Sequence, residues 1–135
     1  MVTYALDAST MLRFLEAEAG ADRVEAIFRE ALRGEARIVA SALHWGEVAG
    51  CAYRSRDRKV VDLVLQRLLQ FGIEVIPVTA EQAVSAALIR ADHRIPYVDA
   101  FGAALATAPD YVFVTADFEL KPAAAIANLE FLPVK

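Results

Sequence analysis

Four acidic residues lie where apolar stretches of the sequence end or where helical patterns begin: Asp7, Glu47, Asp99 and Asp117. Acidic side chains are mostly exposed in proteins and are rarely buried unless they are paired. Acids at strand ends and helix starts are expected to converge on one rim of a sheet, where they would raise one another's pKa unless cations are bound. Carboxylate oxygens are the ligands that hard cations such as Mg²⁺ and Mn²⁺ prefer. The pattern therefore indicates a metal-dependent enzyme in which these four acids form the catalytic, metal-binding set.

The elements that must position the acids alternate along the chain. Five short apolar runs predict strands, and segments with helical periodicity lie between them. The predicted strands are Tyr4–Asp7, Ala36–Ala40, Ile73–Val78, Tyr111–Thr115 and Leu129–Val134, and the predicted helices are 11–18, 22–33, 42–53, 58–71, 80–90 and 99–107. This alternation predicts a single α/β domain over residues 1–135, with a mostly parallel central sheet of about five strands flanked by helices.

The predicted elements bring the acids together. Asp7 ends the first strand and Asp117 closes the fourth, so both lie at the carboxyl edge, where α/β proteins build their sites. Glu47 lies about a turn and a half into the helix after the second strand, and Asp99 begins the helix that returns to the fourth strand. All four side chains are therefore expected to face one cleft.

Composition and charge set limits on the class of protein. The longest apolar stretch is much shorter than the ~18 residues of a membrane-spanning helix, and the first residues lack the pattern of a signal peptide. The single cysteine, Cys51, excludes an internal disulfide and fits a reducing compartment. We therefore expect a cytoplasmic protein with no membrane partner.

The net charge does not decide whether the partner is a nucleic acid. The chain carries a formal charge of −4, which becomes zero when the four candidate ligands are left out. Most of its basic residues are arginines, which suit bidentate contacts with phosphate. Four basic residues cluster between Arg54 and Lys59, where the pattern favours a solvated helix start over a phosphate-binding patch.

The motifs and their order resemble a known family. Leu6-Asp7-Ala-Ser9, then Ser41 with Glu47, then Asp99-Ala-Phe-Gly, then Thr115-Ala-Asp117 are similar to the acidic motifs of PIN-domain ribonucleases, and the size and order are similar to those of VapC toxins. The resemblance runs from Tyr4 to Val134. It implies an endoribonuclease that uses Mg²⁺ or Mn²⁺, an RNA substrate and a small protein antitoxin as partner.

The chemistry of phosphodiester hydrolysis suggests a division of roles within this set, as a hypothesis. Asp7 and Asp99 would be principal ligands, Asp117 a further ligand or water-orienting base, and Glu47 a ligand or an outer acid. Glu119 stands where the family often carries a further acid, so it is an auxiliary candidate. Two hydroxyls close to site acids, Ser9 and Thr115, are auxiliary candidates that could orient a carboxylate or serve as local caps.

Some residues have two interpretations that the sequence leaves open. His44 lies one helical turn before Glu47 and could bond that acid, although the pattern favours surface or core packing. Arg13 could reach phosphate or lie on the surface, and Asp92 matches no motif position. The segment Val60–Phe71 is apolar around more of the helix than one core face needs, which favours either burial in the monomer or an interface in a homodimer or with the antitoxin.

Three other classes of function compete with the nuclease. A catalytically weak RNA-binding or protein-binding regulatory module on the same scaffold would keep the fold, although the presence of all four acids disfavours it. A response-regulator or phosphatase-like domain would need a second acid after the first strand, where Asp7-Ala-Ser9 offers one. A dinucleotide-binding domain would need a Gly-x-Gly-x-x-Gly motif there, and the motif is absent.

Overall fold

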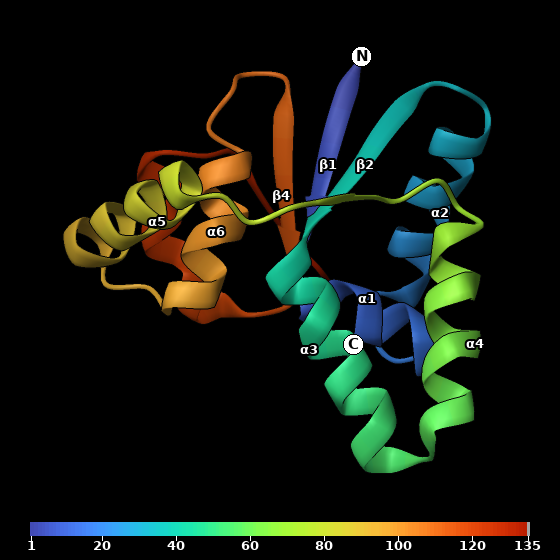
Figure 1. The fold of residues 1–135 in the computed structure, drawn as a ribbon. Coiled ribbons are helices and arrows are strands. Elements are labelled where there is room, and N and C mark those ends of the chain that lie inside the picture. Colours follow the sequence, from blue (N-terminus) through green and yellow to red (C-terminus); the bar gives the residue numbers. More distant parts are fainter. Residues whose placement is uncertain (135) are drawn as a thin grey trace.

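A computed structural model describes residues 1–134 and contains a five-stranded sheet covered on both faces (Figure 1). The strands are β1 (Val2–Leu6), β2 (Ala36–Ser41), β3 (Glu74–Ile76), β4 (Tyr111–Thr115) and β5 (Leu129–Phe131). The helices are α1 (Ala8–Leu15), α2 (Ala21–Leu32), α3 (Ala42–Ser55), α4 (Arg58–Leu69), α5 (Ala80–His93) and α6 (Tyr97–Leu105), followed by a 3-10 helix, η1 (Phe118–Ala125).

The strand order is β3-β2-β1-β4-β5, and every neighbouring pair is parallel. The predicted α/β class and five-stranded sheet are therefore confirmed, with a sheet that is parallel throughout. β1 lies in the centre, because the chain first builds outward through β2 and β3 and then returns to add β4 on the other side. This reversal makes the carboxyl ends of β1 and β4 a topological switch point, where open α/β sheets form their crevices.

Alternation along the strands divides the core between the two faces of the sheet. Tyr4 and Leu6 of β1 pack with Met11, Phe28 and Leu68 under α1, α2 and α4. The residue between them, Ala5, faces the opposite side, where its cluster comprises Val39, Ala86, Ile95, Ala100, Phe101, Ala103, Ala106, Phe113, Leu120 and Ala123. A parallel sheet needs both faces covered, and its strands read as nearly continuous apolar runs for this reason.

Several predicted boundaries differ from the observed ones. The first helix begins at Ala8, three residues before the predicted start, because the Asp7 side chain accepts a hydrogen bond from the Thr10 N–H and caps it. The last helix begins at Tyr97, so Asp99 lies within its first turn. The 3-10 helix over Phe118–Ala125 was not predicted, because Pro122 and a run of alanines give no helical periodicity there.

The local signals at helix ends agree with the structure. Gly34 and Gly72 follow α2 and α4 with φ angles of +75° and +84°, in the left-handed region that glycine adopts without strain. Thr79 and Gln82 form the predicted capping box that opens α5. The apolar residues Met11 and Phe14 of α1 lie in or against the core, where Phe14 packs on Phe28 with ring centroids 4.8 Å apart.

Candidate active site

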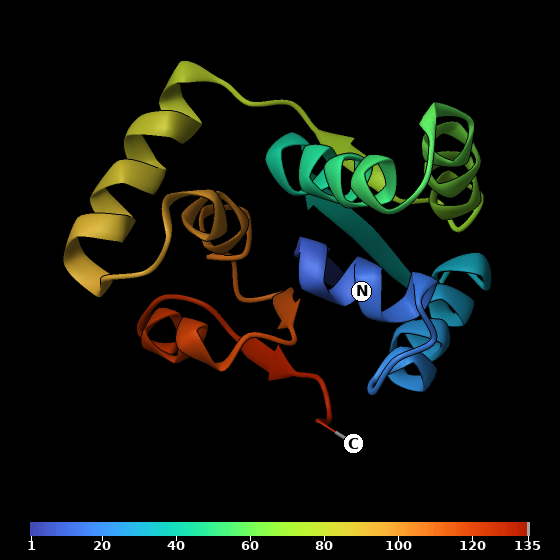
Figure 2. The ribbon, with the colours of Figure 1, turned by 90° about the horizontal axis from the view of Figure 1, so that it is seen from below.

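The four predicted acids come from four different elements around one edge of the sheet. Asp7 directly follows β1, and Asp117 follows β4 after one intervening residue. Glu47 lies on α3, which begins where β2 ends, and Asp99 lies in the first turn of α6. Figure 2 looks at this edge and shows α1, α3 and α6 gathered around it. The carboxyl edge at the switch point therefore carries all four acids.

Asp7 is a buried hydrogen-bond acceptor, and only 2% of its surface is exposed. Its Oδ1 atom accepts from the Ser9 hydroxyl at 2.7 Å and from the Thr10 N–H at 2.9 Å. Its Oδ2 atom accepts from the Thr115 hydroxyl. A carboxylate offers about four acceptor positions, so these bonds leave one position on Oδ2 for a further partner.

The same hydroxyls join the ends of β1 and β4. Ser9 Oγ accepts from the Ala116 N–H at 3.0 Å while it donates to Asp7, and Thr115 Oγ1 accepts from the Asp117 N–H at 3.0 Å. Both hydroxyls therefore orient the Asp7 carboxylate and also fix the loop that carries Asp117. Thr10, which the sequence analysis did not single out, adds a bond from its buried hydroxyl to the Val114 carbonyl at 2.7 Å.

His44 is the residue of this site that sequence reasoning underestimated. Its ring is 0% exposed, and Nε2 lies 3.2 Å from Asp99 Oδ1 and 3.8 Å from Glu47 Oε1. Its spacing of one helical turn before Glu47 was the available signal, but the closer contact is to Asp99, which is 55 residues away in sequence. The second nitrogen, Nδ1, is buried without a hydrogen-bond partner among the described residues.

The pKa of Glu47 depends on its burial and on the charges of the neighbouring site residues. Burial raises the pKa of the Glu47 carboxyl because it disfavours the charged form, His44 opposes this shift, and the negative charges of Asp99 and Asp7 add to it. The side chain of Glu47 is still 49% exposed, whereas that of Asp99 is 19% exposed. Three carboxyl groups therefore share one electrostatic environment, in which Glu47 lies nearest to solvent.

Asp117 and Glu119 lie in different surroundings. Asp117 caps η1 by accepting the Glu119 N–H at 2.9 Å on Oδ1, and it lines a shallow hollow with Ser9 and Arg13. Glu119 lines a separate open hollow with Arg90, Arg94, Ile95 and Pro96. The structure thus keeps Asp117 beside Ser9 of the Asp7 network and places the Glu119 side chain among arginines.

The structure places the two residues whose roles the sequence left open, Arg13 and Asp92, in separate surroundings. Arg13 Nη1 donates to the Ala19 carbonyl at 3.2 Å and so braces the loop after α1. Asp92 is exposed near the end of α5.

A hard divalent cation fits the donor set, although the site is not a closed cage. Within residues 1–134, no three His, Cys, Asp or Glu side chains approach closely enough to hold a metal ion together. Mg²⁺ typically takes one or two carboxylates and keeps several waters, so a complete cage is not required. Burial is the main cause of the raised pKa of Glu47, and the negative charges of Asp99 and Asp7 add to it, so a bound cation would favour the ionised carboxylate.

Comparison with known families identifies the class of the fold. The sequence matches the model of the PIN domain over residues 4–126, so the chain belongs to the PIN-domain family. No curated protein gives a significant match. Among the helices of residues 1–134, none is long and apolar enough to cross a membrane.

Solved structures with the same fold include three from bacterial complexes. VapBC2 from Rickettsia felis bound to a promoter DNA fragment has a TM-score of 0.75 at 16% identity, with 98% of this chain and 100% of that chain covered. DNA-bound VapBC from Salmonella typhimurium has a TM-score of 0.69 at 19% identity, with 97% and 98% covered. FitAcB from Neisseria gonorrhoeae has a TM-score of 0.65 at 20% identity, with 94% and 96% covered. At identities this low, the structural similarity establishes the fold alone.

The raised pKa of Glu47 predicts how stability changes with pH. The folded protein holds the Glu47 proton more tightly than the unfolded chain, so the charged form lowers stability above the raised pKa, and this penalty disappears as the pH falls through it. We expect Glu47→Gln to melt at a higher temperature than the wild type at pH 7 in chelator, and at an equal temperature near pH 4. Glu81→Gln, an exposed substitution on α5, should show no such gain. An unchanged melting temperature for Glu47→Gln at pH 7 would contradict the crowding of charge.

Proposed function

We propose that the chain is a divalent-cation-dependent endoribonuclease of the VapC type, the toxin of a toxin–antitoxin pair. The observation that carries the proposal is the grouping of Asp7, Glu47 and Asp99 at the switch point, where the pKa of Glu47 responds to both other acids. The similarity of the motifs to PIN-domain ribonucleases supports RNA as the substrate. The VapBC and FitAcB neighbours support a partner protein.

Hydrolysis of a phosphodiester requires that negative charge be neutralised and that a proton be moved. A bound Mg²⁺ or Mn²⁺ would supply positive charge against the phosphate and make water a better nucleophile at neutral pH. In the proposed mechanism Asp7 and Asp99 would hold the cation, since the hydrogen bonds to Asp7 leave one acceptor position of its carboxylate open. Ser9 and Thr115 keep the Asp7 carboxylate in one orientation during this step.

The remaining two acids, Glu47 and Asp117, would exchange the proton and orient the water. Glu47 is the most exposed of the three grouped carboxyls, and burial with the neighbouring negative charges raises its pKa, which suits a group that takes up a proton during the reaction. Asp117 lies beside Ser9 in a hollow open to solvent and would orient the attacking water or serve as a further ligand. Arg90 and Arg94 line the hollow next to the start of α6 and would contact neighbouring phosphates.

We expect Asp99→Asn to lower the rate of RNA cleavage by at least ~100-fold, because removal of an interaction with developing charge commonly has an effect of this size. The matched control is Asp92→Asn, which removes an exposed aspartate outside the site and should leave the rate unchanged. The measurement is cleavage of RNA and of DNA of the same sequence, with Mg²⁺, with Mn²⁺ and with excess chelator. Full activity in chelator, or in Asp99→Asn, would overturn the proposed mechanism.

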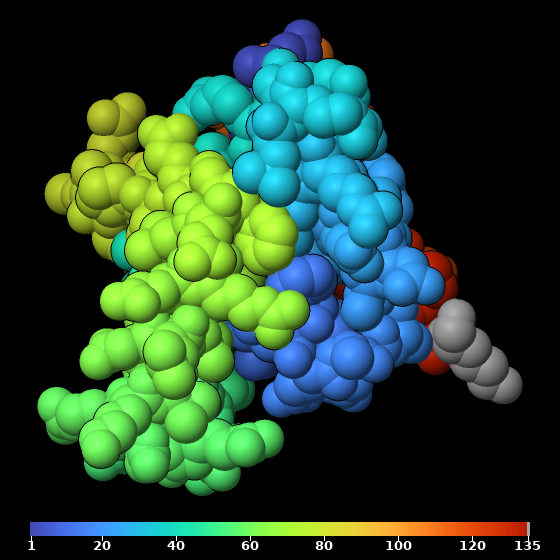
Figure 3. All heavy atoms as spheres, turned by 90° about the vertical axis from the view of Figure 1, so that its right-hand side faces the viewer, coloured from blue at the N-terminus to red at the C-terminus, as the bar shows by residue number. Residues whose placement is uncertain are grey.

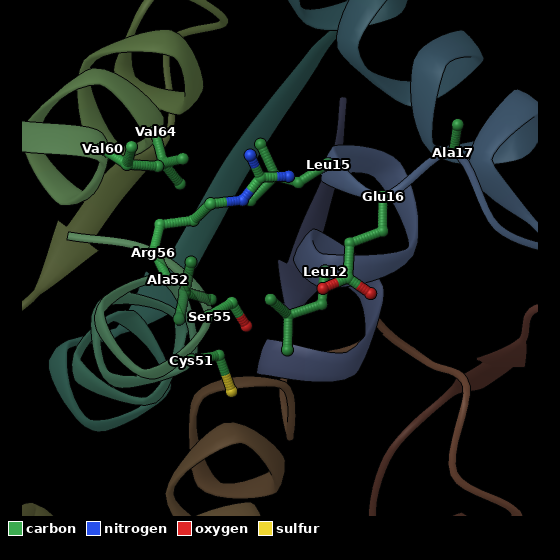
Figure 4. Close-up of a pocket in the computed structure, with 11 residues that line it drawn as sticks. Leu12, Leu15, Glu16, Ala17, Cys51, Ala52, Ser55, Arg56, Val60 and Val64 are labelled. Atoms are coloured by element: carbon green, nitrogen blue, oxygen red, sulfur yellow. The ribbon is translucent and has the colours of Figure 1, made fainter.

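We propose that the antitoxin lies in the groove between α1, α3 and α4. Leu12 and Leu15 of α1 face Val60 and Val64 of α4 across this groove (Figure 4). The buried Val48 of α3 also lines it. Seen from the side, α4 lies next to the segment formed by α1 and α2, and the turn between α3 and α4 extends beyond them (Figure 3). Glu16 and Arg56 place one charge of each sign at the groove, which would fix the register of a mainly apolar segment.

A ribonuclease toxin should inhibit the growth of cells that make it without its partner. We expect expression of the wild-type chain in bacteria to stop growth, and expression of Asp7→Asn at an equal level to permit it, because that substitution removes one ligand charge and keeps the shape of the side chain. Colony counts and protein levels measured together provide the test. Equal growth with both proteins folded would favour the catalytically weak regulatory module.

We also propose a homodimer, whose contact lies on α5 and the start of α6. Val84 and Leu88 are 62% and 61% exposed one turn apart on α5, and Tyr97 is 39% exposed at the start of α6. An exposed apolar patch of this kind commonly marks an interface. Two-fold dimers are the commonest closed assembly. The face on α5 therefore adds a second candidate to the helix 60–71 that the sequence indicated.

Light scattering at micromolar concentration tests the dimer. We expect a mass of about twice the 14.7 kDa chain for the wild type and a monomer for Leu88→Glu, because a buried charge in the contact opposes association. Leu63→Glu is the matched control, since Leu63 is 65% exposed on α4, and it should remain dimeric. A wild-type monomer would refute the dimer and leave the nuclease proposal intact.

A further inference from the structure

The contact between His44 and Asp99 links two helices that carry site acids. His44 belongs to α3 and Asp99 to the first turn of α6, and Nε2 lies 3.2 Å from Oδ1. The imidazole also lies 3.8 Å from Glu47, which is one turn further along α3. A single buried ring is thus adjacent to both the α3 acid and the α6 acid. No motif of the sequence analysis assigned it this position.

The surroundings of the ring fix which nitrogen carries a proton. A carboxylate only accepts hydrogen bonds when it is ionised, so the Nε2 atom that faces Asp99 must carry the hydrogen. Nδ1 has no donor or acceptor partner among the described residues, and the ring is 0% exposed. Hydrogen on Nε2 matches this arrangement, because it gives Asp99 Oδ1 a donor at 3.2 Å. An apolar side chain would fill the same space without leaving a polar atom unpaired.

The packing of α6 confirms that the ring is closely held. Gly102 lies three residues after Asp99, and a Cβ atom there would come within 3.0 Å of His44 Cε1 and 2.7 Å of Phe113 Cζ. Helix α6 can therefore approach the ring only because residue 102 has no side chain. The distance between Asp99 and α3 is set by direct contact with the imidazole and not by flexible surface groups.

We propose that His44 is a positioning residue for the metal-binding acids. Its Nε2–H group holds Oδ1 of Asp99, leaves Oδ2 available to a divalent cation, and fixes Asp99 relative to Glu47. This inference rests on the proposed function in one respect, namely that Asp99 binds the cation. Partners that orient a metal ligand typically change metal affinity or activity by about 10-fold to 100-fold when they are removed.

The first test compares two substitutions by their affinity for Mn²⁺, measured from the signal of free Mn²⁺ in electron paramagnetic resonance. We expect His44→Leu to fold and melt like the wild type but to bind Mn²⁺ at least ~10-fold more weakly, because Asp99 loses its donor. His44→Gln keeps an N–H at a similar reach and should recover most of the affinity. His93→Leu, on the last turn of α5, is the control and should bind as the wild type does. Equal Mn²⁺ affinity in folded His44→Leu would overturn the inference.

The second test needs neither metal nor activity, so it separates this inference from the proposed function. The chain has two histidines, so the ring ¹⁵N signals in nuclear magnetic resonance can be assigned with His93→Leu. We expect the metal-free wild type to show hydrogen on Nε2 of His44, and this signal to shift in Asp99→Ala while that of His93 stays unchanged. Hydrogen on Nδ1, or no response to Asp99→Ala, would overturn the role of His44. A wild type that binds no Mn²⁺ and cleaves no RNA would instead overturn the proposed function.

Discussion

The buried carboxylate of Asp7 organises the carboxyl edge of the sheet. It is removed from solvent at the end of the central strand, where an unpaired charge would be strongly unfavourable. Its oxygens accept hydrogen bonds from Ser9, Thr10 and Thr115, so one anion ends β1, caps α1 and holds the end of β4. The order of the strands makes this possible, because β1 and β4 are neighbours only through the reversal of the chain.

Negative charge at this edge is arranged in a gradient from the interior to solvent. Asp7 is 2% exposed and bonded by three donors, Asp99 is held by a buried imidazole, and Glu47 is the most open of the three with its pKa raised by burial and by its neighbours. In the proposed mechanism the two inner acids would hold the cation, and the outer acid, whose pKa is raised, would exchange the proton. The gradient exists because each acid comes from a different element at a different depth.

The two faces of the domain serve separate purposes in the proposed biology. One face carries the groove between α1, α3 and α4, and the aromatic rings of Phe14, Phe28 and Phe71 pack in the core on the same face. The other carries the exposed apolar residues of α5. Both adjoin helices that bear site acids, since α3 lines the groove and α5 packs on α6. Partner binding and dimer formation could therefore influence the same site.

The sequence by itself determined the class of fold, the approximate strands and helices, and the edge at which Asp7 and Asp117 lie, because apolar periodicity and capping residues act over short distances. It also marked Ser9 and Thr115 as neighbours of site acids. It missed the 3-10 helix around Pro122. It offered Glu47 as the possible neighbour of His44 and did not pair His44 with Asp99. That pairing joins residues far apart in the chain, and it depends on how closely α6 approaches α3 at Gly102. Only the tertiary structure decides such a distance, because it results from the packing of the whole core.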